Sequence, residues 1–207
     1  MKKLESSLKN MVIVLLGVTV ICVALLAYMN ELTKQPIAQA QDNILKEAII
    51  KVVPAFDNNP VEEQKTFEVD GQQIKIFTAK KGGEFVGSAV EAKSPGYGGD
   101  VKILVGFDPE GKIYGYSVLA HSETPGLGSK ATTWFQKDGK SSVIGLNPND
   151  ASFKVSKDGG KIDAITASTI TSRAFLKAIS MAYSAYVGSD SVDGTSGATA
   201  SQTKGKE

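Results

Sequence analysis

One loop, Glu123-Thr-Pro-Gly-Leu-Gly128, has a composition suited to ligand binding and follows a segment rich in strand-forming residues. Its proline and two glycines favour an irregular loop. Glycines let the backbone approach a ligand closely, and successive N–H groups can bind an anion. The spacing Gly126-x-Gly128-x-x-Ala131 resembles a dinucleotide fingerprint, but a hairpin pattern rather than a βαβ unit surrounds it, and a P-loop pattern is absent. By itself the loop predicts either a structural turn or part of a ligand site.

A second segment, Asp163-Ala-Ile-Thr-Ala-Ser-Thr-Ile-Thr-Ser172, combines an acid with a run of hydroxyl side chains just before a predicted helix. Thr171 or Ser172 can cap that helix, but a cap needs only one hydroxyl. The N-terminus of a helix also offers N–H groups and a partial positive charge to a phosphate. Helix capping and a site for a phosphate-bearing ligand are therefore both open interpretations of these residues.

The overall composition narrows the chemistry. The 207 residues contain 23 Lys and Arg against 22 Asp and Glu, a net charge of +1, which argues against nucleic acid as a partner. The chain has one cysteine, Cys22, and one histidine, His121, which argues against a metal site built on these residue types. The sequence around His121 has no readable nucleophile–base–acid arrangement, so a hydrolase is disfavoured. The chemistry is expected from hydroxyls, amides, glycines or an added cofactor.

The N-terminal region has the pattern of a membrane anchor. Met11–Tyr28 carries no charge and approaches the length that crosses a bilayer as a helix. Because lysines precede this run, the positive-inside rule places the first ten residues in the cytoplasm and the rest of the chain outside. A cleaved signal peptide is the alternative, but its apolar core is normally shorter. The predicted organisation is a cytoplasmic tail at 1–10, a transmembrane helix at 11–29, an extracytoplasmic domain at 30–187 and a flexible tail at 188–207.

The elements that position the two segments are those of an α+β domain with a mainly antiparallel sheet and flanking helices. Apolar residues recur at helical spacing before Pro54 and again after Ser172. Between them lie short runs of strand-forming residues separated by turns, and the last two runs form a hairpin. The predicted helices are 30–53 and 172–187, and the predicted strands are 65–69, 73–79, 85–89, 101–107 and 113–120.

Together, the two segments make the chain resemble a known family. The matching stretches are Gly96-Tyr-Gly-Gly99, residues 101–128, Trp134-Phe135 and DAITASTITSRAF at 163–175. They resemble the FMN-binding domain of the G subunit of the Rnf electron transport complex. The resemblance implies a single N-terminal anchor, a domain outside the cytoplasm, and FMN attached covalently through a phosphodiester to a threonine by a flavin transferase.

The family's attachment pattern is roughly Asp, small, any, Ser/Thr, Gly, Ala, Thr. Residues 163–169 occupy these places, so the resemblance implies that Thr169 is the acceptor, supported by Asp163, Thr166 and Ser168. Two positions depart from the pattern, with Ala167 in place of Gly and Ser168 in place of Ala. Both residues are small, so close approach of the flavin phosphate is retained.

A second stretch, Asp193-Gly-Thr-Ser-Gly-Ala-Thr199, matches the pattern at every position. It lies in the predicted flexible tail, with no helix after it. Thr199 is therefore a possible second acceptor, and a tail of biased composition is the alternative. Thr169 is preferred as the functional site.

The resemblance also implies contacts around the flavin. The loop supplies Glu123, Thr124, Gly126, Leu127 and Gly128 as cofactor-binding residues. Trp134 and Tyr97 are candidates for stacking on the ring, with a core role as the alternative. The roles of Glu123, His121 and Arg173 stay open between ligand contact and structure.

The implied role is an electron-transfer subunit of a membrane ion-translocating oxidoreductase of the ferredoxin:NAD type. The implied setting is the bacterial inner membrane, with the domain on the periplasmic side. The implied partners are the other subunits, the flavin transferase and membrane lipid. Two alternatives stay open: the flavin subunit of a sodium-pumping NADH:quinone reductase, and a membrane-tethered assembly module without flavin.

Overall fold

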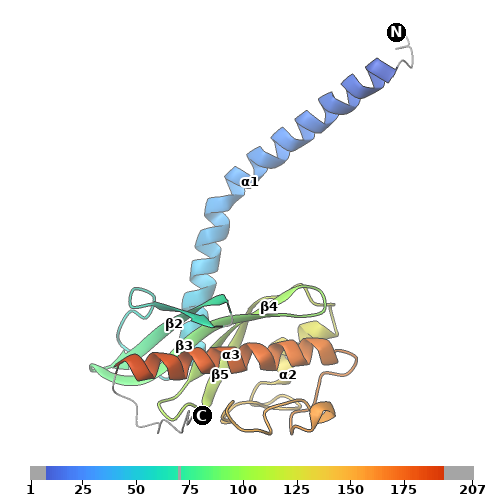
Figure 1. Ribbon diagram of the computed structural model, residues 1–207. Coiled ribbons are helices and arrows are strands. Elements are labelled where there is room, and N and C mark those ends of the chain that lie inside the picture. The colour runs from blue at the N-terminus through green and yellow to red at the C-terminus, as the bar shows by residue number, and fades with distance from the viewer. Residues whose placement is uncertain (1–7, 70, 194–207) are drawn as a thin grey trace, which may run out of the picture. The chain divides into compact units, whose positions relative to one another are not determined.

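The computed structural model describes residues 8–69 and 71–193 (Figure 1). The chain divides into two compact units, Met1–Ile44 and Leu45–Glu207. Helix α1 (Leu8–Val52) begins in the first unit and ends in the second. The apolar run and the segment expected to start a new helix at residue 30 are thus one continuous helix with Pro36 inside it. Propagating a helix past one unfavourable residue costs less than nucleating a new helix, which explains the continuity.

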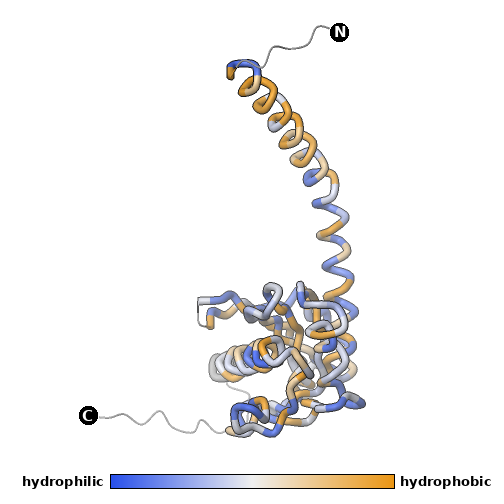
Figure 2. The backbone as a smooth tube through the Cα atoms, turned by 90° about the vertical axis from the view of Figure 1, so that its right-hand side faces the viewer, coloured by the Kyte–Doolittle hydropathy of each residue, from blue (hydrophilic) through white to orange (hydrophobic). Residues whose placement is uncertain are grey.

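The first half of α1 is mostly hydrophobic, as the orange colouring in Figure 2 shows. Within the described residues, α1 alone is long and apolar enough to cross a membrane, and none of its apolar window is buried in the structure. Such a surface is costly to expose to water, so the length and composition suit a bilayer span. The span boundaries 11–29 stay a prediction.

The second unit is built on an antiparallel sheet of five strands in the order β1-β2-β3-β4-β5. Each strand pairs with the next along the chain, and β3 pairs with β4 from Ser88↔Phe107 to Pro95↔Asp100. The strands are β1 (Lys65–Val69), β2 (Gln72–Lys81), β3 (Glu84–Pro95), β4 (Asp100–Phe107) and β5 (Ile113–Ala120). The predicted α+β class is confirmed, although β3 runs six residues beyond its predicted end at residue 89, because β4 supplies pairing partners as far as Pro95.

Helix α3 (Thr169–Asp193) lies across one face of the sheet (Figure 1). Side chains that alternate along β4, among them Ile103 and Phe107, face it. The ring of Phe175 stacks on Phe135 at 4.6 Å and meets Tyr116 edge-on at 4.8 Å. This core also packs the segment from residue 131 to residue 165 against the sheet. The N-terminal half of α3 is thereby fixed relative to the strand ends.

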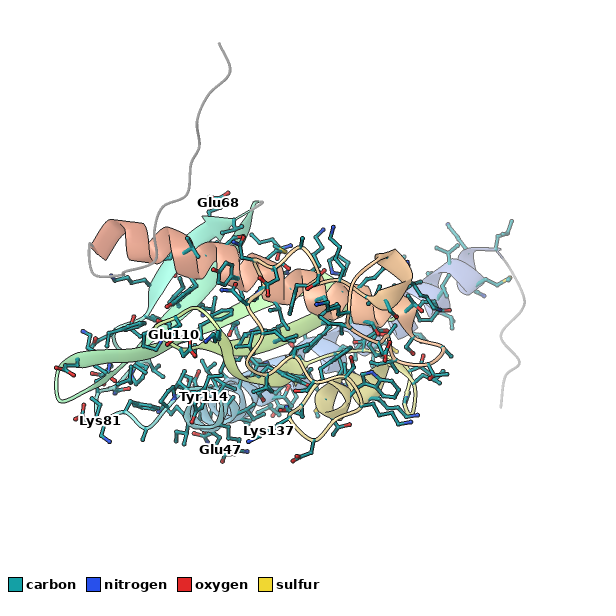
Figure 3. All side chains as sticks on the ribbon, turned by 90° about the horizontal axis from the view of Figure 1, so that it is seen from below. Glu47, Glu68, Lys81, Glu110, Tyr114 and Lys137 are labelled. Carbon is teal, nitrogen blue, oxygen red and sulfur yellow. The ribbon has the colours of Figure 1, made fainter. Side chains whose placement is uncertain are left out.

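The opposite face of the sheet is covered by the last turns of α1. Ile49 and Val52 pack against Phe77 and Leu104 there. A Cβ at Gly106 would lie 1.6 Å from the carbonyl oxygen of Val52, so glycine at that position lets the helix touch the strand. In Figure 3, which views the molecule from below, Glu47 and Tyr114 lie on the side of the sheet away from α3. Both faces of the sheet are therefore buried.

The up-and-down topology places the functional segments together. The turn from Gly96 to Gly99 joins β3 to β4, and the loop beginning at His121 follows β5. Because neighbouring strands are antiparallel, both connections lie at the same end of the sheet. The segment after β5 continues into the 3₁₀ helix η1 (Gly128–Lys130) and the short helix α2 (Ala131–Trp134).

Helix α3 differs from its prediction at both ends. It begins at Thr169 rather than 172 and continues to Asp193 rather than ending at 187. Residues 188–193, assigned to the flexible tail from their composition, are helical. The weak helix formers there extend a helix already nucleated and packed, so each costs only a fraction of the nucleation penalty. Residues 194–207 lie outside the described residues.

Candidate cofactor site

A cavity of about 520 Å³ opens where the loop after β5 meets the start of α3. The two segments, about 40 residues apart in the sequence, form its opposite walls, and the β3–β4 turn contributes one aromatic ring. The residues that line it are Tyr97, Glu123, Thr124, Leu127, Gly128, Ala167, Ser168, Thr169, Ile170 and Thr171. The structure thus brings to one cavity six of the residues predicted to bind the cofactor, Glu123, Thr124, Leu127, Gly128, Ser168 and Thr169, together with the stacking candidate Tyr97.

The Glu123 carboxylate is buried at the base of the loop wall, with 6% of the residue exposed. One oxygen, Oε1, accepts the backbone N–H groups of Tyr97 at 2.8 Å and Gly98 at 3.2 Å. The other, Oε2, accepts the hydroxyl of Thr171 at 2.6 Å. A buried carboxylate requires such donors to offset its lost hydration. Glu123 therefore ties the β3–β4 turn, the loop and α3 together, and both of its oxygens are engaged by the protein.

Two glycines make room for this carboxylate. A Cβ at Gly96 would lie 2.2 Å from Glu123 Oε1. A Cβ at Gly128 would lie 2.6 Å from Glu123 Oε2 and 2.8 Å from the hydroxyl oxygen of Thr171. All three distances are shorter than non-bonded atoms allow. Gly96 and Gly128 therefore leave the space that the buried carboxylate occupies.

The helix wall turns sharply into α3. Ala167 has φ 61°, the one non-glycine residue among those described with a positive φ. This left-handed conformation is costly for a residue with a Cβ and natural for glycine. The attachment pattern that the resemblance implies has glycine at this position, and glycine would adopt the conformation without strain. The strained turn presents Ser168 and Thr169 to the cavity.

The capping expected from Thr171 or Ser172 does not occur, because α3 begins three residues earlier than predicted. Ser172 lies instead inside the first turn, fully buried. Its hydroxyl accepts the N–H of Ile165 at 2.9 Å and donates to the carbonyl of Ser168 at 2.9 Å. Thr171 donates its hydroxyl to Glu123. Both side chains therefore lock the turn rather than cap the helix.

Thr169 is half-buried and forms the first residue of α3. Its hydroxyl oxygen accepts a hydrogen bond from the ammonium group of Lys157 at 3.1 Å. The first N–H groups of a helix lack intrahelical partners and carry the positive end of its dipole. The electrostatic character of this wall is thus positive, from backbone amides and one lysine.

Some predicted site residues lie away from the cavity. Asp163, Thr166 and Gly126 are exposed and do not line it. Gly126 has φ 74°, and its N–H donates to the hydroxyl of Ser129 at 2.9 Å, so it shapes the loop. Thr199 lies outside the described residues.

The aromatic candidates for stacking have different positions. Trp134 donates its indole N–H to the carbonyl of Asp163 at 2.9 Å, so it braces the segment before the helix wall and does not line the cavity. Tyr97 is 73% exposed and does line the cavity. Ile170, which the sequence did not single out, adds a half-exposed apolar side chain to the same cavity.

His121 and Arg173, whose roles the sequence left open, contact other protein groups in the structure. The Nδ1 atom of His121 accepts the N–H of Glu123 at 3.3 Å. The guanidinium of Arg173 donates two hydrogen bonds to Asp158, Nε to Oδ2 at 2.8 Å and Nη2 to Oδ1 at 2.6 Å. These bonds hold the pKa of the Asp158 carboxyl below its usual range and raise the pKa of Arg173. Neither His121 nor Arg173 lines the cavity.

Lys157, which contacts Thr169, is a second residue near the cavity that the sequence reasoning did not single out. It lies in the 3₁₀ helix η2 (Ser156–Asp158), in a lysine-rich stretch with no recognisable motif. A lysine among several others, twelve residues before Thr169, carries no periodic or motif signal. Only the folding of η2 against the start of α3 identifies it.

Comparison with known proteins identifies the region that contains the cavity. A family model described as the FMN-binding domain matches residues 96–184, which contain both walls of the cavity. The G subunit of the ion-translocating oxidoreductase complex of Shewanella piezotolerans is 34% identical over 191 residues, 86% of this chain and 88% of the relative. The corresponding protein of Aliivibrio fischeri, which carries the same description, is 35% identical over 86% of this chain and 89% of its own.

A third relative, the G subunit of the ion-translocating oxidoreductase complex of Haemophilus influenzae, is 37% identical over 78% of this chain and 82% of its own. Among solved structures, NqrC of Shewanella oneidensis covers 66% of both chains at 20% identity with a TM-score of 0.44, a likeness too distant to decide fold or function. The relatives are similar over most of their length and carry one description. This chain belongs to the family of G subunits of ion-translocating oxidoreductase complexes, and it contains that family's FMN-binding domain.

Proposed function

We propose that this chain is the flavoprotein electron carrier of a membrane ion-translocating oxidoreductase of the ferredoxin:NAD type, with FMN joined to Thr169 by a phosphodiester. The observation that carries the proposal is the position of the Thr169 hydroxyl. It belongs to the first residue of a 25-residue helix, and this residue lines a cavity of about 520 Å³. A hydroxyl at that place can join a phosphate that the helix N-terminus also stabilises.

The residues present fit FMN. The amide-rich start of α3 and the ammonium of Lys157 suit the phosphate, while Leu127, Ile170 and Tyr97 offer apolar and aromatic surface to the ring system. A flavin supplies electron transfer in steps of one or two electrons, and the protein supplies its orientation and surroundings. The buried Glu123 keeps the two walls at a fixed separation.

The attachment forms one bond at the flavin phosphorus and breaks another. The Thr169 oxygen forms a bond to the flavin phosphorus and loses its hydroxyl proton to the transferase or to water. Direct condensation with the phosphate monoester of FMN would have to expel water, a poor leaving group. The donor must therefore be a flavin nucleotide activated as a pyrophosphate, and the bond that breaks joins the flavin phosphorus to the bridging oxygen, which leaves with the electron pair on a nucleoside monophosphate.

The motif residues outside the cavity are assigned to recognition by the flavin transferase. Asp163 and Thr166 are exposed on the segment that leads to Thr169, where an enzyme acting on Thr169 can contact them. Thr199, which lies outside the described residues, is the second candidate acceptor, and a variant at this position tests it.

The family and the apolar helix indicate a single-pass membrane protein that works with other subunits of a complex. We place the domain on the periplasmic side of the inner membrane, because the lysines of the first ten residues favour a cytoplasmic N-terminus. Covalent attachment suits that side, where a dissociated cofactor would be lost by dilution. The maturation partner there is the flavin transferase, and the helix contacts lipid.

The test is flavin fluorescence of the full chain on a denaturing gel after co-expression with a flavin transferase. Thr169→Val should abolish the fluorescent band, while Thr199→Val and the matched control Thr133→Val should keep it. Loss of fluorescence only in Thr199→Val would move the attachment to the tail. A dark wild-type band, with the transferase active on a control substrate, would favour the flavin-free assembly module.

A further inference from the structure

A lysine contacts the threonine to which we assign the flavin. The Nζ atom of Lys157 donates to the Thr169 hydroxyl oxygen at 3.1 Å, although the two residues belong to different elements. An ammonium group is a strong donor, yet here its partner is a neutral hydroxyl, which neutralises none of its charge. The contact therefore leaves a positive charge beside the oxygen that would carry phosphorus.

The segment that holds Lys157 is ordered. Val155 forms a bridge with Ile162, and the N–H of Ser156 donates to the carbonyl of Ile162 at 2.8 Å. The N–H of Gly160 donates to the carbonyl of Val155 at 3.1 Å, which closes the turn. The position of the lysine backbone is thus set by its own loop.

The neighbouring carboxylate does not neutralise Lys157. The Asp158 carboxylate accepts two hydrogen bonds from Arg173. Arg173 lies one helical turn after Thr169 on α3. Within residues 8–69 and 71–193, no carboxylate forms an ion pair with Lys157. The pairing of Asp158 with Arg173 therefore both fastens η2 to α3 and leaves the charge of Lys157 free for another anion.

We propose that Lys157 is the counter-charge of the flavin phosphodiester on Thr169, an inference that rests on the proposed attachment. Esterification turns the threonine oxygen into a poor acceptor and places two non-bridging oxygens, sharing one negative charge, next to it. The ammonium then exchanges a neutral acceptor for an anionic one, which strengthens the hydrogen bond. Lys157 is in this sense a positioning residue, which acts by holding the phosphate end of the cofactor.

The test compares Lys157→Gln, Lys157→Arg and the control Lys161→Gln in the full chain co-expressed with a flavin transferase. Lys161 is exposed and forms no side-chain hydrogen bond or ion pair in the described residues, so it matches the charge change without the contact. The initial rate of flavin incorporation is expected to fall about ten-fold in Lys157→Gln, to recover to within about three-fold in Lys157→Arg, and to be unchanged in the control.

A second readout reports on the attached group itself. The ³¹P resonance of the phosphodiester in the folded, detergent-solubilised protein should shift in Lys157→Gln but not in Lys161→Gln, and all variants should coincide after denaturation. A slower incorporation with an unchanged resonance would overturn the proposal, because the lysine would then serve only the transferase. An unchanged rate and resonance would overturn it as well, while loading on Thr169 in both proteins would leave the proposed function intact. Failure of the wild type to load on Thr169 would instead overturn the proposed function.

Discussion

The two walls of the cavity are built on different principles. The loop wall rests on a buried carboxylate, Glu123, whose oxygens are all occupied by protein donors. The helix wall carries an accessible hydroxyl at Thr169, a left-handed alanine beside it and a lysine whose charge is not neutralised. The Glu123 carboxylate of the loop wall therefore has no oxygen left without a protein donor, whereas the helix wall offers a lysine charge and the first N–H groups of a helix for an anion. A polar residue that lines a cavity is thus not necessarily a ligand contact, because other protein groups can already satisfy it.

The largest effect is expected from the loop wall. Glu123→Ala should lower the free energy of unfolding by about 3–5 kcal/mol, because the buried Thr171 hydroxyl and two part-buried amides lose their acceptor and the carboxylate leaves a cavity. Glu123→Gln should cost only about 1–2 kcal/mol, since its carbonyl can serve the two amides and the Thr171 hydroxyl can reverse its role. Urea unfolding of the detergent-solubilised chain can be followed by its single tryptophan, Trp134, which contacts the neighbouring segment.

The control for that measurement is Glu110→Ala, which removes an exposed carboxylate and should change stability by less than about 0.5 kcal/mol. If Glu123→Ala kept its stability but lost flavin incorporation, Glu123 would be a ligand contact, and the contrast between the two walls would fail.

The glycines of the loop wall should separate crowding from backbone strain. Gly128→Ala places a Cβ 2.6 Å from Glu123 Oε2 and should cost about 2–3 kcal/mol. Gly126→Ala meets no atom within 4 Å, so only its φ of +74° opposes the change, at about 1 kcal/mol. Equal losses in the same unfolding assay would show that the buried carboxylate does not crowd Gly128.

A smaller effect, of opposite sign, is expected on the helix wall. Ala167→Gly should raise stability by about 0.5–1 kcal/mol, because relief of the left-handed strain outweighs the greater chain entropy of glycine. Thermal unfolding with and without the substitution measures this. Flavin incorporation should be retained, since glycine is the residue of the family pattern. A destabilised variant would mean that the alanine methyl group makes contacts worth more than the strain.

The smallest effect concerns acid stability near the helix wall. Arg173 lowers the pKa of Asp158 in the folded state, so the unfolded state binds the proton more tightly. The contribution of the Asp158–Arg173 pair to stability is therefore fully present above the unfolded pKa of Asp158, about 3.9. It is lost as the pH falls through the lower pKa of the folded state. Arg173→Gln should raise the Asp158 pKa, measured by NMR titration of its carboxyl carbon, and should leave stability at pH 7 nearly unchanged because the pair is exposed. A pKa that does not move would contradict the pairing.

Much of the fold could be predicted because its signals are local. The apolar run before Tyr28, the alternation in Val101–Phe107 and Ile113–Ala120, and the apolar stripe from Phe175 onward all depend on neighbouring residues. The errors lay at boundaries. The continuity of α1 through Pro36 and the early start of α3 at Thr169 depend on cooperative helix propagation and on packing, which residue types do not report.

The sequence by itself determined the elements, the two segments with unusual chemistry and, through their pairing, the family to which the chain belongs. Tertiary structure alone decided which polar side chains are paired with other protein groups and which can still bind a ligand. The saturation of Glu123 depends on a turn 26 residues earlier and a helix 48 residues later, and the contact of Lys157 with Thr169 depends on how one short loop packs. Hydrogen bonds and charge pairing act over a few ångströms in space, and only the folded chain determines which distant residues come within that range.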